Sequence, residues 1–192
     1  MRLFAFTGSV VILLVLSSAS ARADGFITPF YGYNFGGDSA NCASLTSCNE
    51  KHGNFGISIG AMGGVIGFEE DIAYAKDFFA QTPGAESNVF TAMSNLVINV
   101  PAGPVQPYVL GGIGLIRPHV SLDPSSISAD NNAIGYDIGG GVNVFFLKHV
   151  GVRGDIRHFH TLQDVSVLHL GSIVVGQKLD YNRASVGVTF RF

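Results

Sequence analysis

The sequence predicts an all-β chain, an eight-stranded antiparallel up-and-down transmembrane β-barrel preceded by a cleaved signal peptide. Three observations support this fold class. The chain opens with an export-type leader. Apolar and polar residues then alternate over repeated stretches separated by turn signals. After the leader, no stretch is long and apolar enough to cross a bilayer as a helix, although 47% of all residues are hydrophobic and only 13% are charged.

Residues 1–23 have the features of a secretory signal peptide. Arg2 precedes a short apolar run, and Ala21-Arg22-Ala23 supplies small residues at a cleavage site. A membrane anchor is the weaker alternative, because serines interrupt the run and a spanning helix needs ~20 apolar residues. Cleavage after Ala23 leaves one β-barrel domain, residues 24–192.

The charge of the chain excludes one large class of partners. Lys and Arg number 11 and Asp and Glu number 14, which gives a net charge of −3 at pH 7. Nucleic-acid-binding domains are usually basic, so nucleic acid is not an expected partner. The 25 glycines and the apolar composition leave two architectures open, a glycine-rich β-sandwich and a membrane barrel.

Eight strand-like stretches follow the leader, each close to the ~9–11 residues of a tilted membrane strand. They cover residues 27–35, 54–62, 65–76, 88–100, 106–116, 133–146, 149–159 and 181–192.

The connections between these stretches alternate in length. Short ones follow the second, fourth and sixth stretches, at Gly63-Gly64, at the Pro-Ala-Gly-Pro break and at Leu147-Lys148. Long polar ones cover 36–53, 77–87, 117–132 and 160–180. Short turns at one end and long loops at the other are typical of outer-membrane barrels, with the short turns in the periplasm. The last long connection contains VSVLHLGSIVVG, either a hairpin that extends the barrel wall or a separate strand pair that upsets the count.

Alternation gives each stretch two different faces. Phe55, Ile57 and Ile59 share one face of the second stretch, while Asn54 and Ser58 share the other. A sandwich would turn the polar face to water. The many glycines on that face favour a narrow barrel, where small residues leave room for long charged ones.

Four stretches resemble a known family. QPYVLGGIG, GYDIGGGVNVFF, VGVRGDIRHFHTL and RASVGVTFRF are similar to the small Gram-negative outer-membrane β-barrel proteins with an OmpA/OmpX-type eight-stranded barrel domain. The resemblance implies a location in the bacterial outer membrane, among outer-membrane lipid and lipopolysaccharide. It also implies that the terminal aromatics Phe190 and Phe192 are a signal for the outer-membrane assembly machinery. It does not specify a function, because the family includes adhesins and structural anchors.

Charged residues on the polar face are the first candidate site. Since unpaired charges inside a narrow barrel are unfavourable, we expect them to pair and plug the lumen; a small ion path or binding site is the alternative. This lumen charge cluster comprises Glu69, Asp71, Arg153, Asp155, Arg157, Arg183 and Arg191. Glu70 falls on the lipid face, which indicates either a position near an interface or a bulge that shifts the register.

The histidines are the second candidate. His158, His160 and His169, with Asp164 and Ser166 between them, compose a Ser-His-Asp set on paper, and some outer-membrane barrels modify lipid A with such residues. The His-x-Ser pairing of those enzymes is absent, since the sequence reads HFHT, and proximity in sequence does not make a triad. The spacing matches no common metal motif. We therefore expect no catalytic residue, no metal site and no cofactor.

The two cysteines lie close together in the first long connection. Because the compartment is oxidising, Cys42 and Cys48 are expected to form a disulfide. The predicted function is a structural or surface-interaction role through long extracellular loops whose outside partner the sequence does not name. A narrow channel for small solutes is the alternative, and a lipid-A-modifying enzyme is third.

Overall fold

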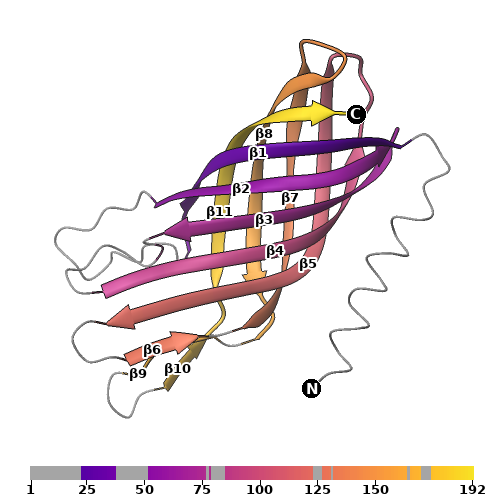
Figure 1. The fold of residues 1–192 in the computed structure, drawn as a ribbon. Coiled ribbons are helices and arrows are strands. Elements are labelled where there is room, and N and C mark those ends of the chain that lie inside the picture. Colours follow the sequence, from indigo (N-terminus) through magenta and orange to yellow (C-terminus); the bar gives the residue numbers. More distant parts are fainter. Residues whose placement is uncertain are drawn as a thin grey trace, which may run out of the picture.

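Eight long antiparallel strands form a closed barrel in this computed structural model (Figure 1). The structure describes residues 23–37, 52–76, 78, 85–122, 127–130, 132–163, 165–169 and 174–192. The barrel strands are β1 (Asp24–Phe35), β2 (His52–Gly63), β3 (Ile66–Lys76), β4 (Ala85–Asn99), β5 (Val105–Leu122), β7 (Ala133–Phe145), β8 (Val150–Thr161) and β11 (Asp180–Arg191). Among the described residues there is no helix with the length and hydropathy of a membrane span.

The barrel closes where the last strand meets the first. β11 pairs with β8 on one side and with β1 on the other, and each remaining barrel strand pairs with its neighbours in sequence order. The backbone amides of Gly25 and Phe192 each donate to the other's carbonyl, at 3.0 and 2.9 Å. The wall is continuous, so the strands satisfy their backbone groups without leaving an edge.

Both chain ends of the barrel lie at the same end as the short turns (Figure 1). We call this the short-turn end. Gly64 and Gly103 lie in two of these turns with φ values of 82° and 72°, a region in which other residues are strained. The third turn joins β7 to β8 across residues 146–149.

The opposite, long-connection end is more structured than the sequence predicted. The fifth strand was expected to stop at residue 116, but β5 continues to Leu122 and pairs there with β4 and with the short strand β6 (Ile127–Asp130). Pro118 has no amide hydrogen, and it lies between the last β5–β7 pair, at Ile116, and the first β5–β6 pair, at His119. The change of partner at this point accommodates the proline.

The predicted 160–180 loop contains a separate strand pair. β9 (Val165–His169) and β10 (Val174–Gln177) form their own two-stranded antiparallel sheet at the long-connection end (Figure 1). Within the described residues they do not enter the barrel wall. The separate strand pair of the second alternative is therefore present, but it does not upset the count, because the barrel keeps eight strands.

The predicted alternation of faces matches the described strands. Phe55, Ile113, Ile156 and Val186 point outward and are each more than half exposed, whereas the polar residues between them are buried inside. An apolar layer fills the lumen at the long-connection end. In that layer the rings of Phe159 and Tyr181 are stacked, with their centroids 4.9 Å apart.

The leader and the two cysteines lie outside the described residues, apart from Ala23.

Candidate functional site

The outer surface of the barrel is mostly apolar, and two polar exceptions on it involve residues that the sequence analysis singled out. The first is Glu70, which was expected on this face without an explanation. Its neighbour across the strands is Ser94 of β4, whose hydroxyl donates to both carboxylate oxygens at 2.9 Å. β3 pairs in continuous register on both sides, so a bulge at Glu70 is excluded. The polar pair shields the carboxylate on an otherwise apolar face.

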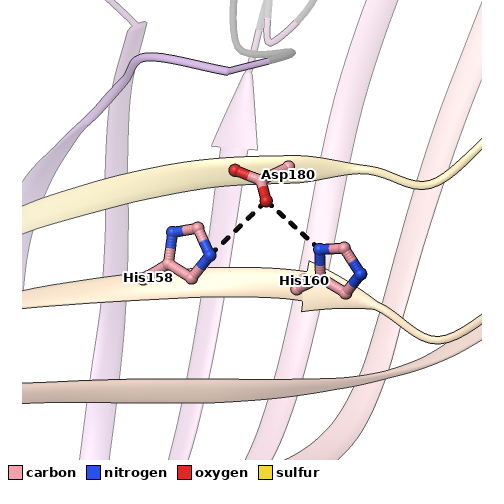
Figure 2. Close-up of side chains that lie close together, drawn as sticks. All are labelled: His158, His160 and Asp180. Atoms are coloured by element: carbon pink, nitrogen blue, oxygen red, sulfur yellow. Dashed lines mark hydrogen bonds and ion pairs between the residues drawn. The ribbon is translucent and has the colours of Figure 1, made fainter.

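The second exception is a His–Asp cluster formed by His158 and His160 of β8 and Asp180 of β11 (Figure 2). Asp180 lies opposite His160 in the strand register, and its Oδ2 is 3.1 Å from His160 Nδ1 and 3.4 Å from His158 Nε2. Asn182 Oδ1 lies 3.1 Å from His158 Nδ1. The ring of Tyr136 lies 5.4 Å from that of His160. All three cluster residues are partly exposed near the long-connection end.

Sequence reasoning did not place Asp180 beside these histidines. Asp164 lies outside the described residues, and β9, which holds Ser166 and His169, is described only for its backbone. The acid that meets the histidines is Asp180, some 20 residues along the chain from His160. Cross-strand register places it there, and this register is not visible in the spacing of the residues.

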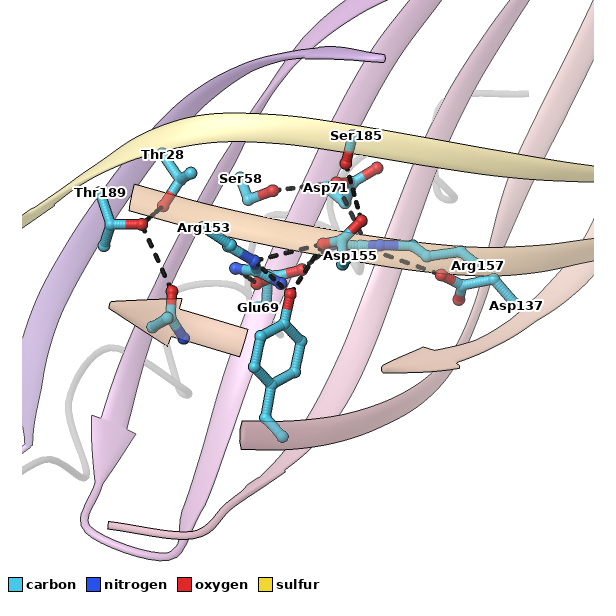
Figure 3. A network of polar contacts seen from close by, with 12 residues as sticks. Thr28, Ser58, Glu69, Asp71, Asp137, Arg153, Asp155, Arg157, Ser185 and Thr189 are labelled. Carbon is cyan, nitrogen blue, oxygen red and sulfur yellow. Dashed lines mark hydrogen bonds and ion pairs between the residues drawn. The ribbon is translucent and has the colours of Figure 1, made fainter. Parts of the chain in front are cut away.

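The lumen is crossed by a network of ionic contacts (Figure 3). Arg157 is at its centre and is 1% exposed. Its guanidinium lies 2.9 Å from Glu69, 3.0 Å from Asp155, 3.3 Å from Asp71 and 3.6 Å from Asp137. The acids come from β3, β7 and β8, so a single arginine ties three strands together.

Arg153 forms the side of the network nearer the short-turn end. It pairs with Glu69, and its Nε lies 3.2 Å from Asp155. Arg153 Nε also donates to the hydroxyl of Tyr108 at 2.6 Å, and that hydroxyl donates to Asp155 at 2.8 Å. Ser185 donates to the other oxygen of Asp155 at 2.7 Å. Asp155 therefore accepts hydrogen bonds at both carboxylate oxygens.

Arg183 forms the opposite side. It donates to Asp71 at 2.7 Å, and Ser58 donates to the second oxygen of the same carboxylate at 2.9 Å. The guanidinium lies over the rings of Phe30 and Phe159, at 4.8 and 4.9 Å. These contacts connect the charged layer to the apolar layer at the long-connection end.

Several polar residues of the network were not among the predicted site residues, including Tyr108, Ser58 and Ser185. Asp137 is buried on the inward face of β7 and was not counted in the predicted cluster. Asn95, with its amide turned so that nitrogen donates, lies 2.6 Å from Asp137 and accepts from Arg157 at 3.3 Å. Inward parity on neighbouring strands is a signal that would have found both.

Arg191, by contrast, lies away from the ionic contacts. It donates to Gln106 at 3.0 Å and covers the ring of Phe145 at 3.8 Å. Its position at the short-turn end separates it from the other members of the predicted cluster. Phe190 and Phe192 point outward at the same end, 44% and 76% exposed.

Glycines give the network its space. A Cβ at Gly139 would lie 2.9 Å from Arg157 Cγ, and one at Gly141 would lie 2.6 Å from the Tyr108 hydroxyl. Both contacts are too close for a side chain. Glycine on β7 is thus required where the long side chains of β5 and β8 cross the lumen.

The network separates two small cavities. One of about 20 Å³ lies on the Arg153 side, and one of about 10 Å³ lies on the Arg183 side. A single water needs ~10–15 Å³, so each has space for about one water. Arg153 Nη2 and Arg183 Nε are buried without a protein partner, and water in these cavities would satisfy them.

Comparisons with known proteins agree with this architecture. The model of the outer membrane protein beta-barrel domain family matches residues 9–192. Among curated protein sequences, none matches this chain.

Solved structures with the same fold come from several bacteria. Neisserial surface protein A superposes with a TM-score of 0.64 at 18% identity, covering 88% of this chain and 97% of that one. A major outer membrane protein of Thermus thermophilus gives 0.60 at 11% identity, with 89% and 100% covered. Ail, the attachment invasion locus protein of Yersinia pestis, gives 0.57 at 11% identity, with 88% and 99% covered. At these identities the likeness shows the fold. The chain belongs to the outer membrane protein beta-barrel domain family, as a small eight-stranded barrel embedded in the lipid bilayer of the bacterial outer membrane.

Proposed function

We propose that this barrel is a closed anchor that acts through its long connections at the cell surface, in a structural or surface-interaction role. One observation carries the proposal, namely that the lumen is occupied. Three arginines and four carboxylates fill its middle layer, and the cavities described on either side of them are water-sized. A barrel with this interior has its useful surface outside the wall and at its ends.

The long-connection end supports a role in contacts. β4 and β5 continue beyond the region where β5 pairs with β7, and they carry β6 with them. The β9–β10 sheet is added at the same end. Such extensions enlarge the area available to a partner while the barrel stays fixed in lipid.

The names of two structural relatives point in the same direction. One is called a surface protein, the other an attachment invasion locus protein, and one structure of the latter contains the heparin analogue sucrose octasulfate. At 18% and 11% identity these names suggest a place to test and do not identify a ligand.

The narrow-channel alternative requires the plug to open. Moving Arg157 aside would leave buried carboxylates without their partner, which is strongly unfavourable at about 3–5 kcal/mol for a broken buried pair. The enzyme alternative has little support, since the carboxylate beside His158 and His160 is Asp180 and no serine joins them among the described side chains.

Electrical recording tests the closed lumen. The mature chain, reconstituted in a planar bilayer with its loops intact, should give no stepwise current, while a wide porin in the same bilayer gives clear steps. Stepwise currents whose size changes in the Glu69→Gln variant would overturn the proposal, because they would place the conduction path through the network.

Thiol labelling tests the outward placement of the long connections. We propose that Cys42 and Cys48 are joined by a disulfide and lie outside the cell. A membrane-impermeant maleimide should label both on intact cells only after mild reduction. As a control, Ala102→Cys in a short turn, on a Cys42→Ser/Cys48→Ser background, should be labelled only after the envelope is opened. Two reactive thiols without reduction would refute the disulfide, and labelling of the short turn on intact cells would refute the orientation.

A further inference from the structure

We propose that His158, His160 and Asp180 bind a divalent transition-metal ion, with zinc the best match, on the outer face of the barrel near its long-connection end (Figure 2). The inference goes beyond a role for the loops, because the site lies on the barrel wall itself.

The spacing of the donor atoms fits a metal ion. Ligands held at ~2.0–2.2 Å around a tetrahedral zinc ion lie about 3.3 Å from one another. Asp180 Oδ2 lies 3.4 Å from His158 Nε2 and 3.1 Å from His160 Nδ1. The three donor atoms all lie within 4.8 Å of one another. Small side-chain rotations would complete the geometry without moving the strands.

The strands hold the donors in place. His158 and His160 are two residues apart on β8 and therefore share one face, and Asp180 lies directly opposite His160 on β11. Sites built on paired strands are more precise than sites built on loops. The pairing continues from Asp180 to Phe190 of β11, so the two ligand-bearing strands cannot separate easily.

Two neighbouring side chains contact the histidines. Asn182 Oδ1 lies 3.1 Å from His158 Nδ1, where it can accept the proton of that nitrogen when Nε2 binds a metal ion. Tyr136 packs against the ring of His160.

The donor set narrows the choice of ion. Two imidazole nitrogens and one carboxylate suit zinc and its neighbours in the first transition row, whereas calcium and magnesium prefer oxygen ligands alone. Three protein ligands leave a fourth position for water or another oxygen ligand. The cluster side chains are 25% to 42% exposed, so an ion can reach them. A bound ion would join β8 to β11 where the 162–179 connection leaves the barrel.

A zinc titration of the whole mature chain tests the proposal. The protein, folded in detergent, carrying no histidine tag and stripped with a chelator, is titrated calorimetrically with zinc chloride. We expect one saturable equivalent, and an affinity at least tenfold lower in His158→Gln, His160→Gln and Asp180→Asn. His149→Gln is the matched control, because it removes a histidine next to the other end of β8, and it should bind like the wild type. Excess calcium or magnesium should not compete.

Three results would overturn the assignment. The first is the absence of a saturable equivalent in the wild type, and the second is unchanged binding in the His158→Gln/His160→Gln double variant. The third is an X-ray absorption spectrum of the loaded protein that lacks two imidazole ligands. Gel mobility of unboiled samples shows that each variant is folded, so a lost equivalent reports the site and not the barrel.

Discussion

Glu69 and Glu70 are adjacent in the chain and occupy opposite environments. Glu69 is completely buried and is contacted by the guanidinium groups of Arg153 and Arg157. Glu70 points outward and is contacted by one hydroxyl, that of Ser94. The Glu69 carboxylate compensates the buried charges of Arg153 and Arg157. The Glu70 carboxylate is an isolated polar group on an apolar face.

The same substitution at these two positions should have different effects. Glu69→Leu should lower the free energy of unfolding by about 3–5 kcal/mol, because two buried arginines lose a shared partner. Glu70→Leu should leave it unchanged or raise it, since an apolar side chain suits a lipid-facing position. Urea unfolding of the folded barrel in lipid vesicles measures both. A larger loss at Glu70 than at Glu69 would mean that the faces are reversed.

Parity predicted which charged side chains enter the lumen but not which of them meet. Glu69 and Arg153 are 84 residues apart, and Asp71 and Arg183 are 112 apart. Contacts of this kind depend on how far each strand is shifted along its neighbour and on the width of the barrel, which the alternation of one strand does not contain. For the same reason, the sequence did not predict that Asp180 contacts His158 and His160. All three residues nevertheless lie on predicted outward positions or directly next to a predicted strand.

At the scale of one element, β11 shows how the wall meets lipid. Val186, Val188 and Phe190 alternate outward along it, while Arg183 and Thr189 are buried inside. Val186 lies near the middle of the strand, and Phe192 follows its end. The depth of an outward position should therefore decide what a charge does there.

An arginine scan along the outward face tests this. Val186→Arg should cost about 2–4 kcal/mol of folding free energy, because it places a charge near the bilayer midplane. Phe192→Arg should cost only about 0–1 kcal/mol in the same refolding assay, because it lies at an interface. Equal costs at both positions would contradict the membrane placement, and the glycine-rich sandwich would again have to be considered.

The β9–β10 sheet should be dispensable for folding. It pairs with itself and not with the wall among the described strands, whereas Leu179 just beyond it is buried and its amide donates to Thr161 Oγ1 at 2.7 Å. Replacing residues 165–177 by a short Gly-Ser linker should leave the urea midpoint almost unchanged. The matched substitution Leu179→Ala should lower stability by about 2–5 kcal/mol, as for other buried leucines. A barrel that fails to fold without the hairpin would show that the hairpin supports the wall.

At the scale of the whole molecule, the strand pattern predicts a closed barrel. The strand register shows how the barrel closes. With no free edge, detergent has no exposed backbone at which to begin unfolding. Unboiled mature protein should therefore migrate differently from boiled protein on a denaturing gel. Identical migration, together with a helical circular-dichroism spectrum of the unboiled sample, would be incompatible with the barrel.

The order of the strands around the barrel was predictable, and the structures beyond it were not. Alternating residues and short turns define up-and-down neighbours because each short turn allows only an adjacent antiparallel strand. Residues 117–122 and 127–130 form a strand extension and its partner, although they contain the Pro, Ser and Asp of ordinary loops. Their pairing depends on β4 continuing alongside, which is tertiary context that overrides local propensity.

Phe192 has one structural role and one proposed role. Phe192 closes the barrel through its backbone bonds to Gly25, and its outward ring is the proposed signal for the assembly machinery. Deleting it should strongly reduce the amount of folded barrel in the outer membrane of cells. Refolding of the same variant into detergent should stay close to the wild type, because only the two hydrogen bonds at one end of a long strand pair are lost. Phe192→Tyr, which keeps both the ring and the backbone, should assemble normally. If the deletion fails equally in both settings, the terminal residue acts through closure and not through recognition.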